Sequence, residues 1–84
     1  MAKNELKKEI KGHNINLRIK LNKEGKVWVA YCKELGVSTF GQSFEETKRR
    51  IEEAIEVYLG TLEDAGKLEE IIRKIKNEKT NRQL

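Results

Sequence analysis

Residues 14–21 alternate strictly between polar and apolar side chains, and this period of two restricts the fold more than any other feature of the sequence. The apolar positions are Ile15, Leu17, Ile19 and Leu21. Successive side chains of a β-strand point to opposite faces, so the pattern predicts a strand with one buried face and one face in water. A connection over 22–26 that contains Gly25 leads to residues 27–32, which are rich in strand-forming types. Together the two segments predict an antiparallel hairpin.

Residues 37–41 predict a third strand, and a long helix is expected to follow it. Ser43 and Glu46 have the spacing of a capping box, in which a hydroxyl and a carboxylate bind free N–H groups of the first helical turn. Apolar side chains then recur at helical spacing up to a stop at Gly66. Gly60, inside this helix, either permits close packing against a neighbour or is only tolerated there.

A second, shorter helix is predicted over 67–79, whereas residues 1 to about 8 and the C-terminal end are expected to be flexible. The sequence therefore predicts one α+β domain over residues 1–84, with its core in 14–65. The expected architecture is a three-stranded antiparallel sheet in the order β-β-β-α. One long amphipathic helix packs on a face of this sheet, and a short helix ends the chain.

The second predicted strand has two apolar faces, unlike the first. Its faces are Val27, Val29 and Tyr31 on one side and Trp28, Ala30 and Cys32 on the other. If the long helix covers the apolar face of the first strand, Trp28 needs a cover from the C-terminal helix, a second subunit or a partner protein. We therefore predict a protein interface made of Trp28, Ala30, Cys32, Leu35 and Phe40. The alternative is that the C-terminal helix folds back over these residues.

Composition narrows the class of protein. No apolar run approaches the roughly 20 residues that span a bilayer, and the polar N-terminus lacks the apolar stretch of a secretory signal. The single cysteine cannot form an intrachain disulfide or a metal cluster. A cytoplasmic protein without membrane contact is expected. The net charge of +4 favours acidic partners only weakly, because lysines and glutamates are interspersed.

The stretch from Val29 to Thr47, VAYCKELGVSTFGQSFEET, resembles the core signature of HicB-type antitoxin domains. In that family an Ala-Tyr-Cys-like run ends a strand, a connection with a leucine follows, and the next strand ends in glycine before a Ser/Thr-capped helix that begins with a Glu-Glu pair. The resemblance covers residues 14 to about 64. The sequence departs from the pattern at Lys33, where a proline is common, and at Thr47, where alanine is usual.

The resemblance implies a partial RNase H-like fold and a non-enzymatic role. It implies that the protein binds a small HicA-type toxin, an mRNA-cleaving protein, and blocks its active site. It also implies self-association, as a dimer or a tetramer. No counterpart of the family's DNA-binding part is expected, because residues 67–84 are too few for it. The family's fold also places a strand after the long helix, and nothing in 61–84 alternates like one.

Enzymatic activity is not expected. A nuclease of the RNase H type needs several carboxylates around two metal ions, but the predicted strands contain no acidic residue and Asp64 is the only aspartate. His13 is the only histidine and has no nucleophile beside it in the sequence, so a surface role is favoured. Cys32 is interpreted as a packing residue. No phosphate-binding loop or zinc spacing is present, so no cofactor or metal is expected.

Two alternatives to the antitoxin hypothesis stay open. One is an orphan domain that only associates with itself. The other is a weak RNA- or DNA-binding protein, which would use Arg18 and Lys20 on the exposed strand face together with the basic C-terminal segment. Base stacking on the sheet would then require aromatic residues, for which Trp28 and Phe40 are the candidates.

Overall fold

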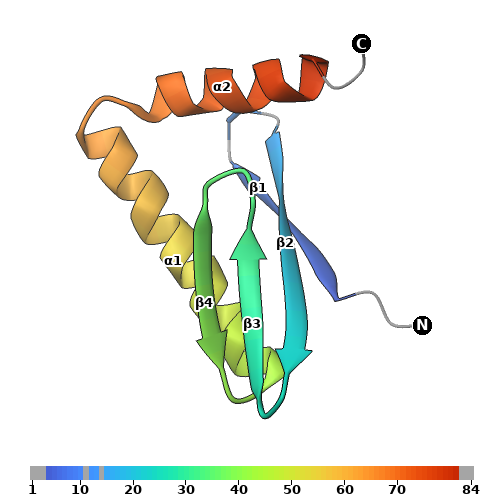
Figure 1. Ribbon diagram of the computed structural model, residues 1–84. Coiled ribbons are helices and arrows are strands. Elements are labelled where there is room, and N and C mark those ends of the chain that lie inside the picture. Colours follow the sequence, from blue (N-terminus) through green and yellow to red (C-terminus); the bar gives the residue numbers. More distant parts are fainter. Residues whose placement is uncertain (1–3, 11, 14, 82–84) are drawn as a thin grey trace.

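The fold is a four-stranded sheet with two helices, in a computed structural model that describes residues 4–10, 12–13 and 15–81, with side chains up to residue 77 (Figure 1). The elements are β1 (Glu5–Ile10), β2 (Ile15–Glu24), β3 (Val27–Cys32), β4 (Val37–Gly41), α1 (Phe44–Asp64) and α2 (Leu68–Asn81). The α+β class, the last two strands and both helices agree with the sequence prediction. Strand β2 runs to Glu24, three residues beyond the predicted end, so the turn shortens to Gly25 and Lys26.

The sheet has four strands instead of the three predicted. Its order is β1-β2-β3-β4, and each strand pairs antiparallel with the next. Residues 5–8, predicted to be flexible, belong to β1. The sequence pattern did not predict this strand, because Lys8 lies between Leu6 and Ile10 at a position that faces the helices. Its ammonium group forms an ion pair with Glu56 of α1 at 3.2 Å. A cation therefore occupies a position where the alternation of a strand predicts an apolar residue.

Helix α1 covers one face of the sheet. It packs against β4 and β3, and more lightly against β2. Figure 1 shows α2 lying across the end of the sheet that holds the β1–β2 connection, far from the β2–β3 turn. No helix covers the opposite face (Figure 1). After α1 the described chain, up to residue 81, contains α2 and no strand.

One hydrophobic core unites all six elements. Its large, fully buried aliphatic side chains on the sheet and α1 are Leu17, Ile19, Leu21, Ile51 and Ile55. Helix α2 adds Ile72 and Ile75, and β1 adds Ile10, to the same cluster. Helix α2 is therefore part of the core. No helix of the described residues is long and apolar enough to cross a membrane.

Candidate binding surface on the open face of the sheet

The pairing register decides which side chains each face of the sheet carries. Ile19 of β2 pairs with Cys32 of β3, and Leu21 pairs with Ala30. Directly opposite residues lie on the same face. Trp28, Ala30 and Cys32 therefore share the face of the apolar β2 residues, which α1 covers. The expectation that these three residues need a different cover was wrong: alternation defines two faces, but only the register, which a one-residue shift inverts, says which of them is buried.

The structure does not bring the five predicted interface residues together on one surface. Ala30 and Cys32 are fully buried. Trp28 is half-buried and meets the ring of Phe44 edge-on, with a centroid distance of 5.3 Å and an interplanar angle of 87°. Leu35, in the β3–β4 connection, is half-buried against the core. Phe40 projects from the other face of the sheet with 62% of its surface exposed.

An apolar patch occupies the uncovered face on β3 and β4. We define it as Val27, Val29, Tyr31 and Phe40. Val29 pairs directly with Phe40, while Val27 and Tyr31 lie two residues to either side of Val29 on the same face. The exposed fractions are 36% for Val27, 45% for Tyr31 and 62% for Phe40. Among the described residues, these three and Val57 of α1 are the large apolar side chains that are exposed.

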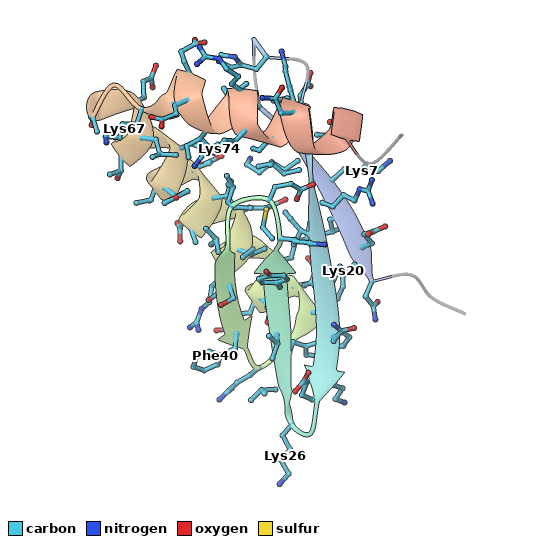
Figure 2. All side chains as sticks on the ribbon, turned by 45° about the horizontal axis from the view of Figure 1, so that its top comes forward. Lys7, Lys20, Lys26, Phe40, Lys67 and Lys74 are labelled. Carbon is cyan, nitrogen blue, oxygen red and sulfur yellow. The ribbon has the colours of Figure 1, made fainter. Side chains whose placement is uncertain are left out.

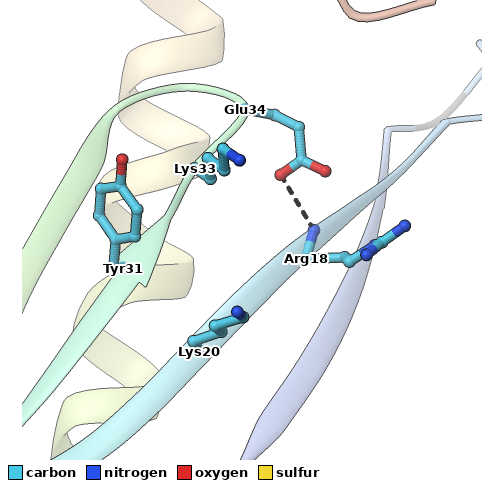
Figure 3. A pocket seen from close by; sticks show the side chains of 5 residues that line it. All are labelled: Arg18, Lys20, Tyr31, Lys33 and Glu34. Carbon is cyan, nitrogen blue, oxygen red and sulfur yellow. Dashed lines mark hydrogen bonds between the residues drawn. The ribbon is translucent and has the colours of Figure 1, made fainter. Parts of the chain in front are cut away.

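A shallow basic pocket adjoins the apolar patch. It has a volume of about 150 Å³ and is lined by Arg18, Lys20, Tyr31, Lys33 and Glu34 (Figure 3). Arg18 and Lys20 come from β2, and Lys33 and Glu34 from the connection after β3. The Glu34 carboxylate accepts a hydrogen bond from the backbone N–H of Arg18 at 3.3 Å. Within the part of the chain that the structure describes, none of the three cations forms an ion pair.

Sequence reasoning identified part of this surface and missed part. It placed Arg18 and Lys20 on an exposed strand face, which the structure confirms. It placed Tyr31 with Val27 and Val29 but assigned their face to the core. The signal that would have located them is the register, which depends on the two-residue turn at Gly25, where φ is +63°.

Cys32 is a buried thiol in the core. Burial is the largest influence on its pKa and raises it, because the thiolate is poorly solvated there. A backbone hydrogen bond from Leu35 opposes this in part, and the nearby Glu34 carboxylate raises the pKa further. The thiol is therefore held in its neutral form, whereas the thiolate is the nucleophile in cysteine chemistry.

His13 lies in the β1–β2 connection beside an open depression at the end of the sheet. Glu9, Gly12 and Lys76 of α2 line the same depression. No group of three histidine, cysteine, aspartate or glutamate side chains able to hold a metal ion occurs among the described residues. The open face of the sheet is therefore the stronger candidate site.

The fold and this face together define an α+β module whose sheet is covered by helices on one face only. Searches of protein-family models, of curated proteins and of solved structures returned no match to the chain.

Proposed function

We propose that this protein is a HicB-like antitoxin-type module, which acts by binding and not by catalysis, and that it holds a small HicA-type toxin against the open face of its sheet. The observation that carries the proposal is the apolar patch on a face that no helix covers. An exposed contiguous apolar surface rimmed by polar residues is typical of a protein-binding site.

The location of the patch agrees with the resemblance. The stretch that resembles HicB domains, residues 29–47, forms most of β3, all of β4 and the first turn of α1. It supplies Val29, Tyr31 and Phe40, three of the four residues of the patch. Aromatic side chains such as Tyr31 and Phe40 are the residue types that contribute most to protein interfaces, because they bury a large area at a small cost in conformational entropy.

Contacts between β4 and α1 fix the backbone beside the apolar patch. Arg50 of α1 donates a hydrogen bond to the backbone carbonyl of Phe40 at 3.0 Å. The same guanidinium group forms an ion pair with Glu46 at 3.1 Å. These contacts hold the end of β4 against the start of α1, beside the exposed ring of Phe40. A surface that is fixed before binding loses less conformational freedom when the partner arrives.

A pair of matched substitutions tests this function. Phe40→Asp places a charge in the patch, and Val57→Asp places the same charge on α1, at a side chain that is 66% exposed. The wild-type protein and both variants are mixed with the HicA-type toxin encoded nearest to the gene, and the masses and dissociation constants of the complexes are measured. We expect the Val57 variant to bind like the wild type and the Phe40 variant to bind at least about 30-fold more weakly, the effect of losing a central interface residue.

The outcome that contradicts the proposal is a folded wild-type protein that forms no complex with the toxin, or a Phe40 variant that binds with unchanged affinity. Circular dichroism spectra of both variants establish that they fold. The mass of the protein without toxin separates the alternative of an orphan self-associating domain. A dimer or tetramer that Phe40→Asp dissociates and that the toxin leaves intact would assign the patch to self-assembly.

A further inference from the structure

The open face of the sheet has a second half that the apolar patch does not explain. Lys7 of β1 lies directly opposite Arg18 of β2, and Lys20 lies two residues further along the same face. Figure 2 shows Lys7 and Lys20 on neighbouring strands. Like charges placed directly opposite each other across two strands destabilise the pair. Together with Lys33, these residues form what we define as the basic half of the open face.

Acidic residues near the basic half reduce its charge but leave it net positive, because four cations face three carboxylates and Glu5 lies directly opposite Lys20. Glu5 and Glu9 of β1 share its face, and Glu34 lines the pocket. The ion pairs between Lys8 and Glu56 and between Arg50 and Glu46 involve none of these residues. The Glu34 carboxylate is turned toward the backbone N–H of Arg18, which occupies one of its oxygens (Figure 3). The cations therefore remain available to an external anion.

The dimensions of the basic pocket suit one anionic group of a larger molecule. Its volume of about 150 Å³ is well below the roughly 300–1,000 Å³ of pockets that enclose a whole small-molecule ligand. Two cations from β2 and one from the β3–β4 connection surround this space, and the ring of Tyr31 forms one of its walls. A phosphate group that is part of a chain lying on the sheet meets these requirements.

Exposed aromatic rings extend from the pocket along the same face. Tyr31 pairs with Ser38, so Phe40 is its diagonal neighbour on β4. Diagonal neighbours on one face of a sheet are about 7–8 Å apart, which is wider than the roughly 3.4 Å rise between stacked bases. Two successive bases that are unstacked from each other can therefore each reach a ring. A charged groove next to aromatic rings is the arrangement that binds single strands.

We propose that the open face of the sheet binds single-stranded nucleic acid, with a phosphate in the basic pocket and bases stacked on Tyr31 and Phe40. An acidic peptide would use the cations but would leave both rings without a matching group. A duplex would keep its bases stacked on one another and away from the rings. The proposal goes beyond toxin binding, and its test requires no toxin.

The test measures fluorescence anisotropy of a labelled 12-nucleotide oligouridylate, an oligothymidylate of equal length and a 12-base-pair duplex at several salt concentrations. We expect the single strands to bind more tightly than the duplex, with log K falling linearly as log[salt] rises and a slope of about −0.7 per phosphate contacted. Equal binding of the two single strands assigns the site to the chemistry shared by RNA and DNA, and a preference for oligouridylate adds contacts to the 2′-hydroxyl.

Matched variants locate the site. Lys20→Gln with Lys33→Gln removes two cations from the pocket, whereas Lys26→Gln with Lys67→Gln removes the same charge from exposed positions away from it (Figure 2). The first pair should weaken binding and reduce the magnitude of the salt slope by up to about 0.7, the share of the one phosphate in the pocket, and the second should leave the slope unchanged. Tyr31→Ala should weaken binding by roughly 5- to 100-fold without changing the slope, while Tyr31→Phe should bind like the wild type. Glu34→Gln, which keeps an acceptor for Arg18, should strengthen binding.

Three results would overturn the proposal. The first is the absence of any oligonucleotide binding by the folded wild-type protein at low salt. The second is an equal loss of affinity in the two lysine double variants, which would indicate a nonspecific charge effect. The third is binding of a poly-glutamate peptide as tight as that of the oligonucleotides and insensitive to Tyr31→Ala, which would make an acidic protein segment the ligand.

Discussion

Gly41, the last residue of β4, lies close to the first turn of α1. A Cβ atom at this position would lie 2.6 Å from Oγ1 of Thr47 and 3.3 Å from its backbone nitrogen. Thr47 is buried, and its hydroxyl donates to the carbonyl of Ser43 at 2.7 Å, so it cannot turn away without losing this bond. We expect Gly41→Ala to lower the free energy of unfolding by about 1–3 kcal/mol, as overpacking of a tight contact does. Urea denaturation measures the change.

Gly60 of α1 serves as the control for Gly41, because alanine at this position is expected to stabilise the protein. No atom lies within 4 Å of the Cβ that this position would carry, so the glycine is tolerated and not required for packing. Alanine is the better helix former, and Gly60→Ala should raise the free energy of unfolding by about 0.5–1 kcal/mol. Equal effects of the two substitutions would refute the close approach at Gly41. The sequence alone does not distinguish the two glycines, because the close contact with Thr47 at Gly41 arises only when β4 packs against α1.

At the scale of single elements, the start of α1 was predicted well. Ser43 accepts a hydrogen bond at its hydroxyl from the backbone N–H of Glu46 at 3.1 Å, which confirms the cap. The Glu46 carboxylate reaches back to the N–H of Gln42 at 2.8 Å, one residue before the position that a capping box prescribes. Such contacts are local in sequence, and for this reason they can be inferred without knowing the fold.

The helix cap predicts that two substitutions of Ser43 differ in their effect on stability. Ser43→Ala leaves the Glu46 N–H without its acceptor and should cost about 1 kcal/mol of folding free energy. Ser43→Asp restores an acceptor and adds a negative charge where the helix dipole favours one, so it should be close to neutral. Thermal unfolding of the three proteins gives the order directly. An aspartate variant as unstable as the alanine variant would show that the cap contributes little.

Strand β1 was missed because its pattern depends on another element. With Lys8 at an inward position, only Leu6 and Ile10 carry the apolar period. The ion pair between Lys8 and Glu56 joins residues that are 48 apart in sequence, and no local rule predicts it. Strand β2 has four apolar residues in strict alternation, and it could be recognised without any partner.

At the scale of the whole molecule, the site was harder to predict than the elements that carry it. The sequence gives the two faces of β3, but the register with β2 and the side on which α1 packs decide which face remains open. A shift of one residue in the pairing register would bury the face of Tyr31 and expose the face of Trp28. A site formed by adjacent strands therefore requires the assembled sheet, even where each strand is predictable by itself.

The shared core predicts that the whole chain unfolds as one unit. Ile75 of α2 is 3% exposed and belongs to the same cluster as the sheet residues. Trp28, the only tryptophan, is the second residue of β3, next to the β2–β3 turn, and Figure 1 shows this turn at the end of the sheet far from α2. Ile75→Ala should lower the free energy of unfolding by about 2–4 kcal/mol, because it leaves a cavity in the core. The loss should be the same when unfolding is followed by tryptophan fluorescence or by far-ultraviolet circular dichroism.

Arg73→Ala, on the exposed side of α2, is the matched control and should move neither curve by more than about 0.5 kcal/mol. If Ile75→Ala shifted the circular dichroism curve while the fluorescence curve stayed in place, α2 would be a separate unit that opens before the sheet. A common shift would mean that α2 stabilises the sheet and its open face from the opposite end of the molecule. Substitutions in α2 would then weaken binding at that face only through the fraction of protein that is folded.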